Sequence, residues 1–397
     1  MIVITDKKDC CGCSACAQVC PKQCIKMSAD NEGFLYPVVD TTTCIDCGLC
    51  EKVCPVINQS ASSLPLATYA AKNTDEEMRA KSSSGGIFTL LAEQIISEGG
   101  VVFGAKFDTD WSVVHAYTET VEGLAAFRGS KYAQSTIGEN YKTAERFLIE
   151  GRKVLFSGTP CQIAGLKKFL RKEYAQLLTI EVVCHGVPSP MVWKDYLEYK
   201  RACTTSSEEA TPNTLPTITD ISFRDKSNSW RKYGVRFCFA STENSGISRE
   251  ITPFYDDPFM RGFLRNLYLR PSCYHCAARS GKSGADLSIA DYWGVHKIHP
   301  KFYDDRGVGL ILVNTNKGAE SYNDISNRLN SLQSKLDKAL AYNPCIIRSV
   351  NEPQQRAEFW RLYNHTNFDI IAQLCPKKKR SFLSKCKRFI KKLINKA

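Results

Sequence analysis

Between residues 67 and 360 the hydrophobic positions alternate between helical and strand-like spacing. The segment "GIFTLLAEQIISEGG" (86–100) has apolar residues at helical intervals and ends in two glycines, and "VVFGAKF" (101–107) follows as a short apolar strand. The same order returns at 141–158, in "YKTAERFLIEG" and "KVLFSG", and at 165–184, in "GLKKFLRKEYAQL" and "LTIEVVC". This repeated alternation predicts an α/β layer with parallel strands.

Residues 1–57 follow another pattern, because cysteines rather than apolar residues recur at fixed spacing. The unit "CCGCSACAQVCP" (10–21) returns about 34 residues later as "CIDCGLCEKVCP" (44–55). The polar segment 57–66 separates this part from the body of the chain, and 203–220 is expected to be a loop or insertion. We therefore expect a multi-domain α/β (α+β) protein with four parts: a cysteine-rich module at 1–57, two halves of an α/β domain at 67–160 and 161–360, and a basic tail at 376–397.

The proline after the last cysteine of each unit fixes the register of the candidate metal ligands. Both units read Cys-x2-Cys-x2-Cys-x3-Cys-Pro, which is the spacing of bacterial ferredoxins with two 4Fe–4S clusters. Three thiolates surround one cluster, and the fourth crosses to the other. Structural zinc sites instead use two separated Cys-x2-Cys pairs, so the spacing disfavours zinc. The first cysteine set is Cys10, Cys13, Cys16 and Cys54, and the second cysteine set is Cys44, Cys47, Cys50 and Cys20.

Four further cysteines lie where an α/β sheet collects ligands. Cys161 falls in the first turn of a helix for which Thr159 is a suitable N-cap and Pro160 a suitable first residue. Cys184 ends an apolar strand, and "RPSCYHC" adds a Cys-x2-Cys pair. Spacing alone leaves open whether these are ligands of a third 4Fe–4S cluster, a zinc half-site or unrelated thiols. The third cysteine set is Cys161, Cys184, Cys273 and Cys276.

The remaining cysteines match no ligand pattern. Cys11 and Cys24 fit neither ferredoxin-like run and are expected to be ordinary thiols. His185 and His275 are expected to be neighbours of the third cysteine set rather than ligands. The cysteines expected to be free are Cys203, Cys238, Cys345, Cys375 and Cys386.

Cysteine usage and charge indicate the environment of the protein. Nineteen cysteines without a secretory signal predict a reducing compartment, and no apolar run is long enough to predict a membrane span, so we expect a cytoplasmic metalloprotein. Residues 377–397 hold ten Lys and Arg, and removing them from the net charge of +12 leaves about +2, which argues against nucleic acid as a partner. Apolar residues recur at helical spacing within the tail, which fits peripheral contact with the inner face of an anionic membrane, an acidic partner or a solvated helix.

No G-x-G-x-x-G motif follows a predicted strand, so a dinucleotide-binding Rossmann site is not indicated. Small, polar loops are present at 81–88, 128–135 and 156–162. The "SSSGG" segment opens a helix, where free backbone N–H groups suit a phosphate or a flavin diphosphate, with Arg128, Lys131 and Lys81 as sources of positive charge. A simple helix cap is the alternative.

The segments "SSSGG", "RGSKYAQS", "LFSGTPCQIAGLKKFL", "VCHGVPSP", "RPSCYHC" and "ADYWGV" occur in this order. Over residues 67–345 the chain thereby resembles the beta-subunit family of coenzyme F420 hydrogenases and dehydrogenases. The resemblance implies an iron–sulfur flavoprotein with FAD and favours a third 4Fe–4S cluster at the third cysteine set. It also implies that the flavin contacts Ser83, Ser84, Gly85, Gly86, Arg128, Lys131, Ser157, Gly158 and Thr159.

Three functions remain open at this point. The first is an oxidoreductase that passes electrons between a hydride carrier, such as reduced coenzyme F420, and an external redox partner through FAD and the clusters. The second is a non-catalytic electron-transfer subunit of a larger complex, for example one serving membrane-associated polysaccharide biosynthesis, and the third is a sensor or scaffold. A flavin pocket within 67–345 would separate the first from the others. The sequence indicates no catalytic acid or base, since Asp291 in "ADYWGV" is as well explained by a structural role. It also indicates no oligomeric state.

Overall fold

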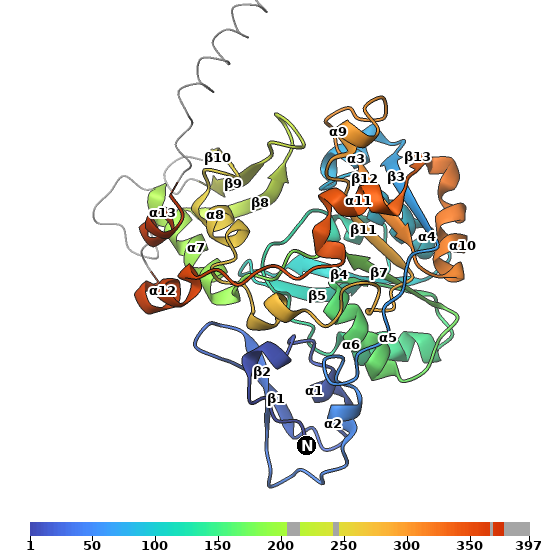
Figure 1. Ribbon diagram of the computed structural model, residues 1–397, viewed down its shortest axis with the longest axis vertical. Helices are drawn as coiled ribbons and strands as arrows, with labels where there is room; N and C mark the ends of the chain where they lie inside the picture. Colours follow the sequence, from blue (N-terminus) through green and yellow to red (C-terminus); the bar gives the residue numbers. More distant parts are fainter. Residues whose placement is uncertain (205–214, 241–245, 366–367, 377–397) are drawn as a thin grey trace, which may run out of the picture.

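The computed structural model describes residues 1–204, 215–240, 246–365 and 368–376. The N-terminal segment forms a small ferredoxin-like unit that lies below the rest of the molecule in Figure 1. It contains an antiparallel hairpin and short helices that follow the cysteine runs: η1 (Lys7–Asp9), α1 (Ala15–Val19), β1 (Ile25–Ala29), β2 (Leu35–Val39) and α2 (Leu49–Lys52).

The two cysteine runs fold in the same way, as their sequence repeat predicts. Gly12 and Ser14 have φ values of +70° and +62° in the first run, and the equivalent Asp46 and Gly48 have +49° and +69° in the second. These left-handed residues turn the chain tightly between successive cysteines. The short helix of each run begins directly after the second of these residues.

The large sheet has the strand order β13-β3-β12-β11-β7-β6-β4-β5. Its central strands β4, β6, β7 and β11 are mutually parallel, as the helix–strand alternation predicts, and the flanking strands pair antiparallel. The sheet is therefore mixed. Its strands are β3 (Ala67–Asn73), β4 (Val101–Phe107), β5 (Val113–Thr118), β6 (Val154–Gly158), β7 (Leu177–Val182), β11 (Leu287–Asp291), β12 (Gly309–Val313) and β13 (Leu329–Gln333).

Helices cover both faces of this sheet. Apolar residues of α4 (Ile87–Ser97) and α10 (Asn316–Asp324) pack on one face, and those of α5 (Asn140–Ile149) and α6 (Pro160–Leu170) pack on the other. The ferredoxin-like unit contacts α5 and α6 through α1 (Figure 1). The remaining elements around the sheet are α3 (Glu76–Lys81), η2 (Glu122–Phe127), α9 (Val295–Ile298), η4 (Ser326–Arg328), α11 (Leu336–Tyr342) and η5 (Pro344–Ile346).

The boundaries of α6 differ from those predicted. The capping box of Thr159 and Gln162 starts the helix at Pro160, as expected from Thr159 and Pro160, but the helix ends at Leu170 rather than near residue 177. Arg171 adopts the left-handed conformation with φ of +58°, which ends the helix so that the chain can turn into β7. Cys184 accordingly lies two residues beyond the end of β7 instead of at its last position.

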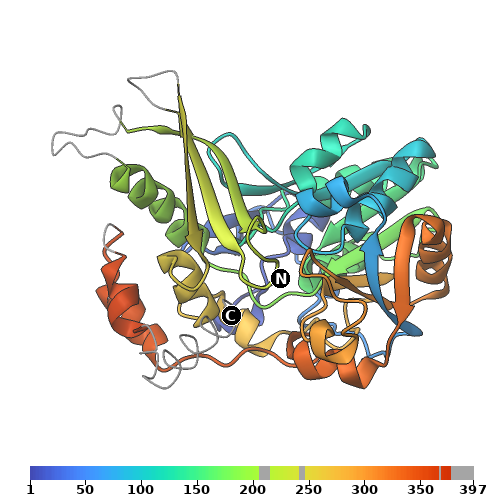
Figure 2. The same cartoon turned by 90° about the horizontal axis from the view of Figure 1, so that it is seen from above.

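A second lobe stands beside the large sheet, as Figure 2 shows from above. Its small sheet has the order β10-β9-β8, and its helices flank that sheet. The predicted loop at 203–220 is wrong at its end, because β8 begins at Thr217; residues 205–214 lie outside the described residues. The elements are α7 (Pro190–Cys203), β8 (Thr217–Asp225), β9 (Gly234–Ala240), β10 (Ile247–Pro253), α8 (Pro258–Leu264), η3 (Pro271–His275), α12 (Gln355–Leu362) and α13 (Asp369–Leu374).

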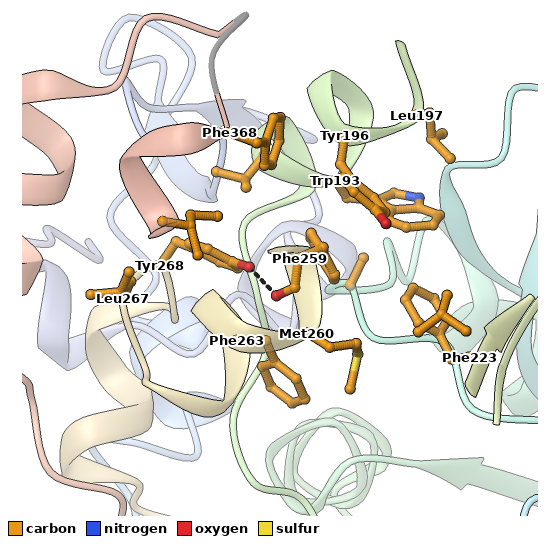
Figure 3. Close-up of a cluster of buried hydrophobic side chains, with 14 of the residues drawn as sticks. Trp193, Tyr196, Leu197, Phe223, Phe259, Met260, Phe263, Leu267, Tyr268 and Phe368 are labelled. Carbon is orange, nitrogen blue, oxygen red and sulfur yellow. Dashed lines mark hydrogen bonds between the residues drawn. The ribbon is translucent and has the colours of Figure 1, made fainter. Parts of the chain in front are cut away.

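An aromatic core holds the second lobe together (Figure 3). Trp193 and Tyr196 of α7 pack against Phe259 of α8, with ring centroids 5.3 and 5.2 Å apart. The Tyr268 hydroxyl donates a hydrogen bond to the Phe259 carbonyl, so the polar end of this buried ring is satisfied. The lobe thus has a core of its own beside the sheet.

The described part of the chain contains no helix with the length and hydrophobicity needed to cross a bilayer. The predicted amphipathic tail helix lies outside the described residues, as does Cys386.

Candidate functional site

The second cysteine set surrounds a small cavity at the outer end of the ferredoxin-like unit. All four of its members line this cavity, together with Cys24, for which we predicted no role. Backbone N–H groups point at two of the sulfurs, from Asp46 to Cys44 Sγ at 3.4 Å and from Ile2 to Cys50 Sγ at 3.3 Å. Such donors stabilise thiolate charge and are common around iron–sulfur clusters. Cys47 is exposed, so this set lies at the protein surface.

The first cysteine set lies deeper, between the second set and the body. Burial, together with the neighbouring Cys10 and Cys54, raises the pKa of Cys16 to about 12. Cys54 in turn lies near both Cys10 and Cys50. The structure therefore brings Cys54, from the second run, to the cysteines of the first run, as the crossed-ligand pattern requires.

The third cysteine set lines another cavity, where η3 and the end of β7 meet α6. All four of its members lie in the wall, and the backbone N–H of Val187 points at Cys273 Sγ at 3.4 Å. Cys11 belongs to the same wall and lies against Cys161. A residue that matched no ligand pattern thus connects the first set to the third.

Burial of the third set tests whether a cluster fits. Burial raises the pKa of Cys184 well above its usual value and that of Cys273 to about 12. These thiols would remain protonated at neutral pH unless a metal centre offset the burial of their charge. The four cysteines line one cavity, so the donor set suits a thiolate-bound cluster.

A larger cavity, about 510 Å³ in volume, lies between the large sheet and the second lobe. Its size is within the range of small-molecule and cofactor pockets. The loops after β6 and β7 form its floor, and the start of α4 and the loop after η2 form one wall. All nine residues that the resemblance implied as flavin contacts lie in its lining: Ser83, Ser84, Gly85, Gly86, Arg128, Lys131, Ser157, Gly158 and Thr159.

The "SSSGG" and "RGSKY" loops meet in one wall of this cavity. The hydroxyls of Ser83 and Ser130 are 2.9 Å apart and join the two loops. Arg128 Nε is buried and lacks a hydrogen-bond partner among the described residues, which leaves a cationic donor for an anionic ligand. Lys131 Nζ donates to the carbonyls of Ala126 and Arg128 at 2.7 and 2.9 Å, and burial lowers its pKa to about 7. This wall fits a diphosphate.

Not every predicted contact presents a free polar group to the cavity. The Ser157 hydroxyl donates to the Phe103 carbonyl at 2.9 Å, and that of Ser84 donates to the Val308 carbonyl at 2.9 Å. Lys81 is exposed, pairs with Glu77 and does not line the cavity. Ser84 and Ser157 can therefore shape the cavity through their backbone, whereas Lys81 lies outside it.

A neutral histidine braces the floor of the cavity. His115 Nε2 donates to the Ser157 carbonyl at 3.0 Å, so its Nδ1 accepts from the Ser135 hydroxyl at 2.9 Å. Gln162 Nε2 donates to the same hydroxyl at 2.9 Å. Burial lowers the pKa of His115 to about 4, which keeps the ring uncharged at neutral pH. This network fixes the loop after β6, where the flavin ring is predicted to lie.

An ion pair connects the two lobes at the cavity. Asp291, at the end of β11, accepts from both terminal nitrogens of Arg224 at 2.8 and 3.0 Å and from Trp230 Nε1 at 3.0 Å. These contacts hold both oxygens of the carboxylate, which fits a structural role rather than proton transfer.

The cavity and the third cysteine set share a wall. Cys184, Gly186 and Val187 line both the large cavity and the cavity of the third set. His185 Nε2 contacts Asn266 Oδ1 at 2.7 Å, and its Nδ1 is 3.8 Å from Cys345 Sγ. The large cavity and the third, first and second cysteine sets thus follow one another from the body to the exposed Cys47.

Sequence reasoning missed several residues of this arrangement. His115 and Arg224 line the large cavity, yet they lie in no motif that would single them out. Gln162 also lines it and lies inside "LFSGTPCQIAGLKKFL", but its neighbour Cys161 was singled out instead. Arg270 stands inside "RPSCYHC" but was passed over in favour of its cysteines. The repeat itself offered a signal for Cys11, because the second run has Ile45 at the equivalent position. In the structure Ile45 is 59% exposed, whereas Cys11 is buried.

Family models match most of the chain. A 4Fe–4S dicluster domain model matches residues 9–58, which supports iron–sulfur clusters in the ferredoxin-like unit. The models described as coenzyme F420 hydrogenase/dehydrogenase, beta subunit N-term and C terminus, match residues 68–139 and 151–337. These two ranges together cover well over half of the sequence.

Individual known proteins match less completely. The coenzyme F420-dependent sulfite reductase of Methanocaldococcus jannaschii is 31% identical over 117 residues, which are 28% of this chain and 18% of that protein. The chain therefore spans less than a fifth of that relative. A chain of the F420-reducing NiFe hydrogenase complex from Methanosarcina barkeri superimposes with a TM-score of 0.45 at 17% identity, over 71% of this chain and 91% of that one. A likeness at this level carries no functional argument.

Proposed function

The chain belongs to the coenzyme F420 hydrogenase/dehydrogenase beta-subunit family, and from this premise we propose that it is an iron–sulfur flavoprotein oxidoreductase. In this proposal it exchanges electrons between a hydride carrier at the large cavity and an external redox partner at the ferredoxin-like unit. The observation that carries the proposal is the wall of Cys184, Gly186 and Val187, which the large cavity shares with the cavity of the third cysteine set. Reduced coenzyme F420 is the first carrier to test, because the family bears its name.

Different residues of the chain would bind the flavin, hold the clusters and contact the external partner. The loops around Ser83 and Arg128 would bind a flavin diphosphate, and His115 with Gln162 would hold the loop against which the ring lies. The three cysteine sets would hold three 4Fe–4S clusters, and the more deeply placed first and third sets would shield theirs from water. A bound flavin accepts two electrons as a hydride and releases them singly, which matches one-electron iron–sulfur acceptors. The exposed Cys47 marks the end at which an external partner would dock.

Cofactor content tests this proposal. Protein purified without oxygen is expected to contain about twelve iron atoms and one FAD per chain, because three four-iron clusters accompany one flavin. Iron analysis, flavin extraction and bleaching of the flavin by reduced coenzyme F420, NADH or NADPH provide the measurements. About eight iron atoms and no flavin would instead indicate a simple ferredoxin-like relay.

The pH dependence of flavin binding tests the role of the loop around Lys131. Burial lowers the pKa of Lys131 to about 7, and a bound diphosphate would raise it by favouring the ammonium form. FAD affinity is therefore expected to be constant below about pH 7 and to fall by up to about tenfold per pH unit above it, until the raised pKa is passed. Flavin fluorescence titrations of flavin-stripped protein measure this.

Lys131→Met is expected to bind FAD more weakly and to lose this pH dependence. Lys81→Met, which changes an exposed lysine outside the cavity, serves as the matched control. If the wild-type affinity for FAD is independent of pH between 6 and about 9, Lys131 does not contact the diphosphate as proposed.

A further inference from the structure

Arg270 lies where the first and third cysteine sets meet. It directly precedes η3, which carries Cys273, and its side chain extends to the ferredoxin-like unit. Nε donates to the Cys10 carbonyl at 2.7 Å, and Nη2 donates to the Leu35 carbonyl at 2.8 Å and to Cys10 Sγ at 3.5 Å. Nη1 donates to Gln134 Oε1 at 3.0 Å. The guanidinium therefore contacts a ligand of the first set while it lines the cavity of the third.

The charge of Arg270 has no partner of the usual kind. The residue is 1% exposed, and no carboxylate of the described residues lies within 4.0 Å of its nitrogens. Buried charges are normally paired, because removing an ion from water costs several kcal/mol. Its other neighbours are carbonyls, an amide and the ring of Tyr36, whose centroid is 4.3 Å away. Only the sulfurs can supply a full negative charge.

We propose that Arg270 is the shared counter-ion of the clusters held by the first and third cysteine sets, and that its charge raises the reduction potentials of both. The inference rests on the proposed function, since it requires the third cluster. A 4Fe–4S centre with four thiolates is anionic and gains another negative charge on reduction, so a nearby buried cation stabilises the reduced form more than the oxidised form. Arg270 thereby favours the reduced form of the two clusters at the junction between the body and the ferredoxin-like unit.

Other cations near the cysteine sets act differently. Arg279 is buried against the third set, on the side of the large cavity, and donates to the carbonyls of Cys184 and His185 at 3.0 and 3.1 Å. Its hydrogen bonds to described residues go to the carbonyls of Cys184, His185 and Cys345 and not to the ferredoxin-like unit. Lys8 is half-exposed and pairs with Asp6, so solvent and a carboxylate screen its charge. Arg270 alone, among the residues that line the third cavity, is a buried cation bonded to a first-set cysteine.

Redox titration of the anaerobic full-length holoprotein, followed by electron paramagnetic resonance, tests the proposal. In Arg270→Gln, the equilibrium constants for reduction of the first and third clusters are expected to fall about tenfold, which is about 59 mV for a one-electron step. The reduction potential of the second cluster should not change. Arg270→Lys, which keeps the charge, should retain most of the wild-type reduction potential of both clusters. Arg279→Gln should lower the reduction potential of the third cluster only. The third cluster is identified by its loss in Cys161→Ala/Cys273→Ala, and the second by its loss in Cys47→Ala.

Arg356→Gln is the matched control. Arg356 is also buried and also contacts the ferredoxin-like unit, but it pairs with the carboxylate of Glu32, with Nη1 3.0 Å from Oε1. Its replacement should leave all three potentials unchanged. Equal shifts of the three clusters, or shifts in Arg356→Gln as large as those in Arg270→Gln, would overturn the proposal.

Iron content separates the remaining outcomes. If Arg270→Gln does not retain iron, Arg270→Lys must restore it, and loss of iron in both variants would assign Arg270 a purely structural role. Wild-type protein with about eight iron atoms and no third signal would refute the proposed function itself. Wild-type protein with about twelve, together with unshifted potentials in Arg270→Gln, would refute the role of Arg270 alone.

Discussion

Replacing Cys161 and Cys273 together by alanine is expected to remove about four iron atoms and to disconnect the large cavity from the ferredoxin-like unit. Two of four ligands are lost, so the third cluster should not assemble. Reduction of the first and second clusters by the hydride donor should then slow by more than about a hundredfold. Replacing a residue that only hydrogen-bonds a metal ligand already costs up to about a hundredfold in activity, and here two ligands themselves are lost. Iron analysis and stopped-flow absorbance measure the two effects.

This pair of cysteines separates electron transfer from flavin binding. Neither Cys161 nor Cys273 lines the large cavity, whereas Cys184 lines both cavities. Bleaching of the flavin should therefore remain close to the wild-type rate. Cys203→Ala/Cys238→Ala removes two cysteines that lie in neither cavity and should keep all iron. Unchanged iron content in Cys161→Ala/Cys273→Ala would show that the third cysteine set holds no cluster.

Local sequence predicted the features that depend on short stretches of chain. The spacing of the cysteines concerns residues within one run, and the two runs, which share that spacing, fold alike at Gly12 and Asp46. The Thr159–Pro160 start of α6 is equally local, because a helix cap involves only neighbouring residues. The parallel centre of the large sheet followed from the alternation of elements, whereas its antiparallel edges carried no such pattern.

Features that join distant parts of the chain could not be predicted in this way. Arg270 and Cys10 meet although they are 260 residues apart, and nothing in "RPSCYHC" indicates which element its arginine will contact. The large cavity likewise needs the second lobe, whose β8 and β9 were not recognised as strands. The candidate ligands were therefore accessible from sequence, whereas the groups that would tune and enclose them required the structure.

The close approach of the ferredoxin-like unit to α6 depends on the absence of a side chain at Gly165. A Cβ atom there would lie 2.8 Å from Cys13 Cβ, 2.9 Å from Cys13 Sγ and 3.0 Å from Tyr141 Oη. Distances of this size force a shift, and Cys13 has little freedom because it belongs to the first cysteine set. Gly165→Val is therefore expected to push α1 away from α6 and to widen the gap between the first and third sets.

Gly165→Val is expected to destabilise the protein by about 1–3 kcal/mol, as overpacking of a dense interior usually does. Electron transfer from the third set to the first should slow strongly while iron and flavin contents remain near the wild-type level, because no ligand has changed. Rapid kinetics, iron analysis and chemical denaturation measure these effects. Gly246→Val is the control, since its Cβ would meet no atom of the described residues within 4 Å. Wild-type electron transfer in a folded Gly165→Val protein would mean that contact between α1 and α6 is not needed to connect the two cysteine sets.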